Sequence, residues 1–164
     1  MTSERASRNF GIAQTVLLSA FAAVFFLDDG ARLFSPGGAA SAIGTALCVV
    51  GLLLMLAAFI SLRAVIQVEP EPRRGGHLVM NGVYAVLRHP IYTAISIVIV
   101  GLFLRKPTVF VGLAGAGVIG FLLVKVQLEE RLLAARFPEY AGYMSRTWGM
   151  IPGLGRRTPS QPPP

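Results

Sequence analysis

Residues 42–62 read AIGTALCVVGLLLMLAAFISL and contain no charged side chain. At about 1.5 Å per residue, a helix of this length covers roughly 30 Å, which is the thickness of the hydrocarbon core of a bilayer. The apolar residues form one continuous block rather than alternating with polar ones. This stretch therefore predicts a transmembrane helix and an integral membrane protein.

Three more apolar segments lie on either side of this block, at residues 10–27, 90–104 and 108–128. The third segment of the chain, 90–104, is short for a span. Only Arg105-Lys106-Pro107 separates it from the fourth, which predicts a tight helical hairpin with Pro107 at the start of the next helix. The predicted fold class is all-α, a polytopic membrane helical bundle of about four transmembrane helices with a cytoplasmic C-terminal helical segment.

Composition agrees with a membrane chain of one domain. Of the 164 residues, 54% are hydrophobic and 14% are charged, whereas a soluble domain carries about 25% charged residues. Mean hydropathy is +0.63. We expect a single integral membrane domain over residues 1–155. The remaining residues 156–164, RRTPSQPPP, have no apolar side chain to bury and predict a disordered tail.

The basic residues flank the apolar blocks and determine the expected topology. With the N-terminus inside, eleven arginines fall on the cytoplasmic side, while only Arg32, Arg105 and Lys106 fall outside. This bias predicts that both termini are cytoplasmic, in a bacterial-type inner (plasma) membrane. The net charge of +7 is explained by topology and anionic lipid headgroups, so nucleic-acid binding is not expected.

The first polar constellation surrounds the start of the third segment. Pro90 suits the first turn of a helix, whose free N–H groups form a natural anion site, and Arg88 adds a positive charge beside it. His89 supplies a donor or acceptor, and Tyr84 and Tyr92 supply rings with polar tips. The same residues also suit an interfacial belt that anchors a helix end among headgroups.

The second constellation lies at the cytoplasmic end of the fourth segment. Lys125 and Glu129 are spaced i, i+4 and share a helix face, and Glu130 follows directly. Carboxylates at this depth need a cationic partner. They therefore predict either a helix-end ion pair, with Lys125 reaching the headgroups, or a site in which Glu129 holds a cationic ligand group and Lys125 an anionic one. The third constellation, residues 137–152, is also typical of an amphipathic segment on the membrane surface.

Several kinds of site are disfavoured by what the sequence lacks. The histidines are His77 and His89, too few for a zinc motif, and Gly75-Gly76 is too short for a phosphate loop. No metal is therefore expected. A channel would place polar rings within its spans, yet only Lys125 is charged inside one. The polar residues gather at one membrane face, which is typical of a ligand site there.

Three motifs follow one another in this region: GHLV at residues 76–79, GVY at 82–84 and RHPIY at 88–92. After a short helical hairpin, a second group follows, consisting of Glu129, Glu130, Leu133, Phe137, Glu139, Tyr140, Tyr143 and Pro152. Their order and spacing resemble the signature of the isoprenylcysteine carboxyl methyltransferase family, and the phospholipid N-methyltransferases are similar here. The resemblance covers about residues 67–152.

This resemblance implies methyl transfer from S-adenosyl-L-methionine to a lipid-like acceptor at the cytoplasmic face, with residues 67–152 as the cofactor-binding half. The implied cofactor residues are His77, Leu78, Val79, Tyr84, His89, Pro90, Ile91, Tyr92 and Glu129. By their own chemistry, Arg88 or the helix start at Pro90 suits the cofactor's carboxylate, and Glu129 suits its cation. Tyr84 or Tyr92 can pack the adenine ring.

Lys125 and Glu130 are the candidate catalytic residues, the first from the resemblance and the second from the chemistry of an amine acceptor. Lys125 falls where the prenylcysteine enzymes have an arginine that orients the acceptor carboxylate, and a lysine keeps the charge without the bidentate fork. If the acceptor is an amine, Glu130 or His89 is the candidate base. The acceptor itself stays open among a prenylated protein, a phospholipid amine, an isoprenoid lipid and a small thiol.

Two other functions remain open from the sequence. One is a membrane reductase of the sterol-reductase-like type, which is similar in its C-terminal half and uses NADPH. The other is a small non-catalytic membrane protein whose polar motifs are only interfacial anchors. Membrane lipids are expected partners of all three, and the small residues from Gly112 to Gly120 permit an oligomer.

Overall fold

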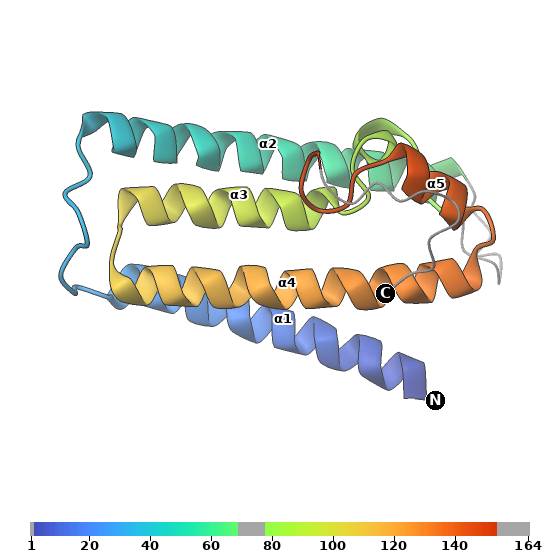
Figure 1. The fold of residues 1–164 in the computed structure, drawn as a ribbon, viewed down its shortest axis with the longest axis horizontal. Helices are drawn as coiled ribbons and strands as arrows, with labels where there is room; N and C mark the ends of the chain where they lie inside the picture. The colour runs from blue at the N-terminus through green and yellow to red at the C-terminus, as the bar shows by residue number, and fades with distance from the viewer. Residues whose placement is uncertain (1, 69–77, 154–164) are drawn as a thin grey trace. The chain divides into compact units, whose positions relative to one another are not determined.

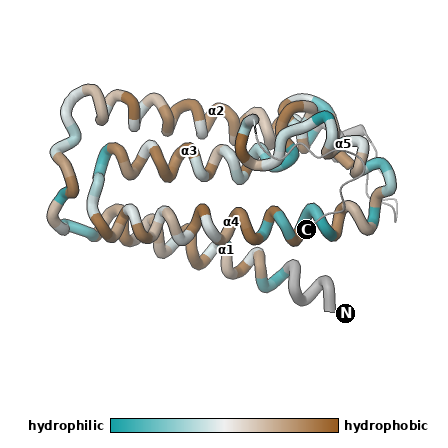
Figure 2. The backbone as a smooth tube through the Cα atoms, in the orientation of Figure 1, coloured by the Kyte–Doolittle hydropathy of each residue, from teal (hydrophilic) through white to brown (hydrophobic). Residues whose placement is uncertain are grey.

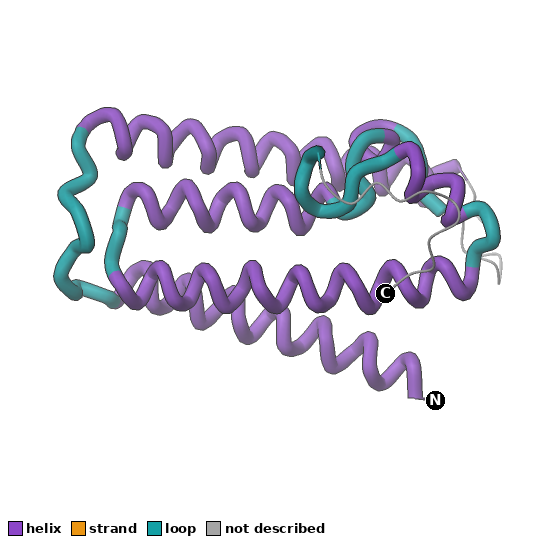
Figure 3. The backbone as a smooth tube through the Cα atoms, viewed as in Figure 1, coloured by secondary structure: helices purple, strands orange, loops and turns teal. Residues whose placement is uncertain are grey.

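The computed structural model describes residues 2–68 and 78–153. Within these ranges the chain is helical and has no strand, which confirms the predicted all-α class (Figures 1 and 3). The helices are α1 (Thr2–Leu27), α2 (Gly38–Val68), the short 3-10 helix η1 (Gly82–Ala85), α3 (Pro90–Arg105), α4 (Val109–Arg136) and α5 (Tyr140–Arg146).

Three of the described helices are long and apolar enough to cross a membrane, over Arg8–Leu27, Gly38–Arg63 and Val109–Arg136. Figure 2 shows hydrophobic residues along most of their length. The fourth apolar helix, α3, has 16 residues, and at 1.5 Å per residue it covers about 24 Å, less than the hydrocarbon core. The short third segment predicted from the sequence is thus confirmed as a short helix.

The chain divides into two compact units. The first consists of Met1–Val49 and Ser96–Lys125, and the second of Val50–Ile95 and Val126–Pro164. The expected disordered tail, residues 156–164, lies outside the described residues. The second unit contains the RHPIY motif, the last turns of α4 and all of α5.

In the first unit, the hairpin between α3 and α4 is fixed by hydrogen bonds to the end of α1 and the loop after it. Lys106 Nζ donates to the Phe25 carbonyl at 2.8 Å, and the Thr108 hydroxyl donates to the Asp28 carboxylate. The Val111 N–H donates to the Thr108 hydroxyl at 3.2 Å. Thr108, rather than Pro107, therefore caps the start of α4, because its side chain satisfies a free N–H of the first turn.

Also in the first unit, α2 and α3 approach each other at two glycines. A Cβ added to Gly101 would lie 2.6 Å from the Gly44 carbonyl oxygen and 2.8 Å from Cys48 Sγ. A Cβ on Gly44 would lie 2.6 Å from the Gly101 carbonyl oxygen. Small residues at such a crossing allow two membrane helices to pack backbone to backbone.

Candidate functional site

The RHPIY motif places its side chains by starting a helix. Pro90 is the first residue of α3, where its missing N–H leaves no donor unpaired. The His89 carbonyl accepts the Thr93 N–H at 3.0 Å, and the Thr93 hydroxyl donates to the Met150 carbonyl at 2.5 Å. The start of α3 is therefore fixed both by its own first turn and by the chain after α5.

The GVY motif forms the turn that presents Tyr84. Gly82 has a φ of +59° and begins η1. This left-handed conformation favours glycine, because a Cβ is disfavoured there. The Tyr84 carbonyl accepts the Tyr143 hydroxyl at 2.6 Å, which connects η1 to α5.

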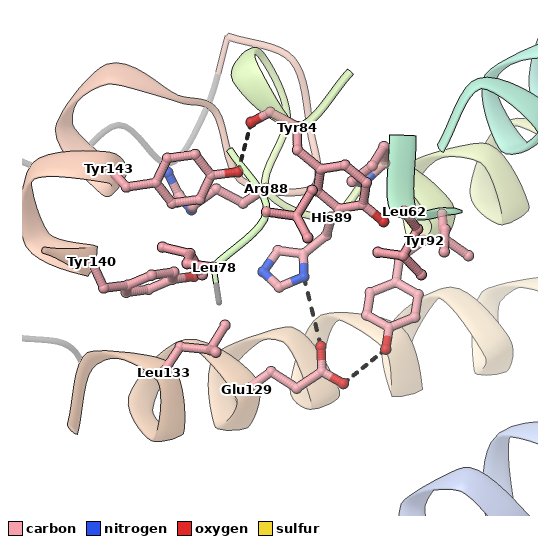
Figure 4. A pocket seen from close by; sticks show the side chains of 13 residues that line it. Leu62, Leu78, Tyr84, Arg88, His89, Tyr92, Glu129, Leu133, Tyr140 and Tyr143 are labelled. Carbon is pink, nitrogen blue, oxygen red and sulfur yellow. Dashed lines mark hydrogen bonds and ion pairs between the residues drawn. The ribbon is translucent and has the colours of Figure 1, made fainter. Parts of the chain in front are cut away.

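These elements line an open pocket in the second unit with a volume of about 250 Å³, slightly smaller than the roughly 300–1,000 Å³ of typical ligand pockets. Its walls come from the end of α2, the segment before α3, the start of α3, the end of α4 and α5 (Figure 4). The lining residues are Leu62, Leu78, Val79, Tyr84, Arg88, His89, Pro90, Ile91, Tyr92, Glu129, Leu133, Tyr140 and Tyr143. Every candidate cofactor residue lines this pocket except His77, which lies outside the described residues.

Glu129 is the acidic side chain that reaches the pocket. Its carboxylate accepts the Tyr92 hydroxyl at 2.8 Å, and its other oxygen lies 3.7 Å from His89 Nδ1. The His89 and Tyr92 rings are stacked, with centroids 5.7 Å apart and planes 9° from parallel. The Glu129 side chain is 32% exposed, so a ligand can reach its negative charge. Figure 4 shows the three side chains converging on one side of the pocket.

Arg88 is committed to other parts of the protein. Its Nε donates to Glu130 Oε1 at 2.8 Å, and its Nη1 donates to the Met144 and Thr147 carbonyls at 3.1 and 2.6 Å. The side chain is only 2% exposed. Its backbone N–H also donates to the Trp148 carbonyl at 2.9 Å. Arg88 therefore joins the RHPIY motif to α4 and to the end of α5, although it also forms part of the pocket wall.

Glu130, a candidate base, lies behind the pocket wall. Its side chain is 4% exposed and does not line the pocket. Besides its ion pair with Arg88, Glu130 Oε1 lies 3.4 Å from His89 Nε2. That separation is within ion-pair range but lacks hydrogen-bond geometry. His89 is thus placed between two carboxylates, Glu129 on the pocket side and Glu130 behind it.

Lys125, the other candidate catalytic residue, belongs to the first unit. Its Nζ donates to Gln14 Oε1 on α1 at 2.5 Å. The structure therefore gives this intramembrane lysine a polar partner on a neighbouring span, as buried membrane cations require. Lys125 does not line the pocket of the second unit.

Four lining residues are absent from the predicted set of site residues: Leu62, Leu133, Tyr140 and Tyr143. Leu133 could have been predicted from the sequence, because it is spaced i, i+4 from Glu129 and shares its helix face. Tyr140 and Tyr143, three apart on α5, belong to the second group of family-like residues, but the resemblance assigns them no role. Leu62 ends the apolar block of α2 and carries no sequence signal, since only the tertiary fold brings it here.

The tyrosines of the pocket keep their protons at neutral pH. Burial raises the pKa of Tyr84 and raises the pKa of Tyr143 to about 12. Burial and the negative charge of Glu130 raise the pKa of Tyr140 as well. The pocket therefore combines neutral hydroxyls, aromatic rings and leucines with the accessible carboxylate of Glu129. Such walls suit a ligand that has a flat ring and a positive charge.

Within residues 2–68 and 78–153, no three His, Cys, Asp or Glu side chains come together as a group able to hold a metal ion.

Comparison with known proteins identifies a family for most of the chain. Residues 39–140 match the family described as phospholipid methyltransferase. The cobalt-zinc-cadmium resistance protein CzcN of Cupriavidus metallidurans is 34% identical over 85 residues, which cover 50% of this chain and 38% of that protein. The nickel-cobalt-cadmium resistance protein NccN of Alcaligenes xylosoxydans xylosoxydans is 34% identical over 85 residues, covering 50% of this chain and 39% of that protein. The match thus spans about two fifths of each relative's length. No solved structure matches significantly.

Proposed function

This chain belongs to the phospholipid methyltransferase family, and from that premise we propose that it is an S-adenosyl-L-methionine-dependent methyltransferase acting on a lipid-like or isoprenoid acceptor. The observation that carries the proposal is the pocket of the second unit, where motifs that are separate in the sequence line one cavity with Glu129 accessible inside it. The chain is an integral membrane protein, with three helices able to span the bilayer within the described residues.

The residues of the pocket fit the proposed cofactor. S-adenosyl-L-methionine carries an ammonium group and a sulfonium, and Glu129 offers an accessible carboxylate for positive charge. The rings of Tyr84, Tyr140 and Tyr143 and the leucine side chains offer walls for the adenine. Arg88 is less suited to the cofactor's carboxylate, because its Nε and Nη1 already donate to Glu130 and to backbone carbonyls. We therefore propose that the helix start at Pro90 receives the cofactor's carboxylate.

When bound, the cofactor supplies an electrophilic methyl group. The residues of this chain contribute mainly by holding the reacting groups in line and keeping water away. Glu129 fixes the charged end of the cofactor, while Tyr92 holds the Glu129 carboxylate in place by its 2.8 Å hydrogen bond. Leu62, Leu78 and Leu133 contribute apolar side chains to the lining, which disfavours water beside the bound cofactor.

For an amine acceptor, we propose His89 rather than Glu130 as the group that takes the proton. The His89 ring lines the pocket, whereas Glu130 is buried in its ion pair with Arg88. Glu129 and Glu130 flank the ring at 3.7 and 3.4 Å and fix its orientation.

A lipid-like acceptor is supported by the origin of one pocket wall. Leu62 belongs to the candidate span Gly38–Arg63, so a membrane-spanning helix contributes directly to the site.

The excess of arginine at the ends of the spans near this pocket supports a cytoplasmic location for the site and for both termini, in a bacterial-type inner membrane. Membrane lipids are then natural partners, and a homo-oligomer is compatible with the small residues on α4. Lys125 remains a proposed group for orienting an acidic acceptor.

The proposal is tested by transfer of a labelled methyl group from S-adenosyl-L-methionine to a membrane lipid extract, using purified protein in detergent. We expect label to enter the organic phase with the unmodified protein and to fall at least tenfold with Glu129→Gln, as for the loss of a charge-assisted contact. Glu139→Gln is the matched control, because Glu139 is exposed and does not line the pocket. Equal incorporation by Glu129→Gln and the unmodified protein would exclude this site as the methyl-transfer site.

A further inference from the structure

The pocket has two chemically different ends. At one end, buried Tyr140, Tyr143 and Met144 form an apolar cluster against which Leu78 and Leu133 pack. At the other end lie Glu129, Tyr92 and His89, linked by a hydrogen bond and an ion contact. Figure 4 shows Tyr140 beside Leu78 and Leu133 at the left and Tyr92 at the right, with the Glu129 carboxylate turned toward Tyr92.

The Tyr140 hydroxyl lacks a hydrogen-bond partner within the described part of the chain. The residue is 1% exposed, and its hydroxyl oxygen is buried and unpaired. Its neighbours differ, since the Tyr143 hydroxyl donates to the Tyr84 carbonyl at 2.6 Å and the Tyr92 hydroxyl donates to Glu129 at 2.8 Å. An unpaired buried hydroxyl destabilises a fold, so a residue that lines a pocket and keeps one requires an explanation, such as a partner supplied from outside the protein.

The hydroxyl is a donor over the whole physiological range. Burial and the nearby Glu130 carboxylate raise the pKa of Tyr140 above its ordinary value of 10, so the proton is retained. The Tyr140 ring packs against apolar and aromatic side chains. A ligand group that suits this end is therefore flat, largely apolar and able to accept one hydrogen bond, which describes a nucleobase better than an amino acid.

Building on the proposed function, we propose that the pocket binds the methyl donor in one orientation, with the adenine ring at the Tyr140 end and the amino-acid group at the Glu129 end. In this orientation the Tyr140 hydroxyl donates a hydrogen bond to a ring nitrogen of the adenine. The reverse orientation would place an ammonium group among Leu78, Leu133 and Tyr140, and would leave the Glu129 carboxylate without a cation from the ligand.

The test compares two ligands by calorimetric titration of the detergent-purified full chain. S-adenosylhomocysteine contains both adenine and the amino-acid group, whereas 5′-methylthioadenosine contains only the nucleoside part. We expect Tyr140→Phe to weaken both ligands by the same factor, about three- to tenfold, as for the loss of one hydrogen bond. We expect Glu129→Gln to weaken S-adenosylhomocysteine alone and to leave 5′-methylthioadenosine unchanged.

A matched control separates a ligand contact from a structural role. Tyr143→Phe also removes one pocket hydroxyl, but that hydroxyl already has a partner in the protein. The melting temperature of the ligand-free protein should fall with Tyr143→Phe, and should stay the same or rise with Tyr140→Phe. The proposed orientation would be overturned by a lower melting temperature of Tyr140→Phe, by unchanged ligand affinity in that variant, or by weaker binding of both ligands to Glu129→Gln. If the unmodified protein binds neither ligand, the proposed function itself fails, which is a distinct result.

Discussion

Arg88 shows how a motif residue can serve the architecture of a site. It donates through Nε to Glu130 and through Nη1 to the carbonyls of Met144 and Thr147, with almost no exposure to solvent. These bonds join three segments that are remote in the sequence. The position of His89, the next residue, depends on this connection, because His89 lies 3.4 Å from the same Glu130 oxygen.

Removal of the Glu130 charge should therefore destabilise the protein. Glu130→Gln leaves the buried Arg88 guanidinium without its counter-charge, and breaking a buried pair in this way costs about 3–5 kcal/mol. We expect a clearly lower melting temperature in detergent, whereas Glu139→Gln, the same change at an exposed position, should melt close to the unmodified protein. A normal melting temperature for Glu130→Gln would show that the pair does not stabilise the second unit.

The site residues that lie near one another in the sequence are the ones that could be predicted. His89, Pro90 and Tyr92 lie within one turn of a helix start, and Glu129 follows a recognisable apolar block. The partners of Arg88 could not be predicted, since they are carbonyls 56 and 59 residues away and every residue offers a carbonyl. The partner of Lys125 is Gln14, 111 residues away, and no local pattern indicates which polar residue of another span it meets.

Hydropathy predicted which segments of the chain form helices better than it predicted how long those helices are. The apolar blocks at 10–27, 42–62 and 90–104 lie inside α1, α2 and α3. The fourth block ends at residue 128, yet α4 continues to Arg136 through charged residues. Hydropathy reports the part of a helix that lipid accepts, whereas Glu129 and Leu133, which line the pocket, lie on the polar continuation. The functional end of α4 therefore lies beyond its most apolar part.

The approach of α2 and α3 in the first unit predicts different outcomes for two glycines. Gly101→Ala would bring a methyl group 2.6 Å from the Gly44 carbonyl oxygen, and overpacking of this kind costs about 1–3 kcal/mol. At Gly117, also in a helix, an added methyl group would meet nothing within 4 Å, so Gly117→Ala should be neutral or slightly stabilising because alanine favours helix. Thermal unfolding in detergent compares the two, and equal melting temperatures would contradict the close approach.

For the whole molecule, the excess of arginine on one side predicts that both termini and the pocket are cytoplasmic. Single cysteines introduced in a Cys48→Ala background test this with a membrane-impermeant maleimide on intact cells. Ser35→Cys, exposed in the loop between α1 and α2, should react from outside. Glu139→Cys, exposed just before α5, should react only after the cells are permeabilised. The reverse pattern would place the pocket on the outer face.

Calorimetric titration of the detergent-purified chain is the sharpest test of whether the pocket of the second unit binds a methyl donor. S-adenosylhomocysteine and NADPH are titrated in parallel, with Glu129→Gln as the site variant. We expect saturable binding of S-adenosylhomocysteine that is weakened by Glu129→Gln, and no binding of NADPH. Binding of NADPH alone, or of neither compound, would show that the pocket is not a methyl-donor site.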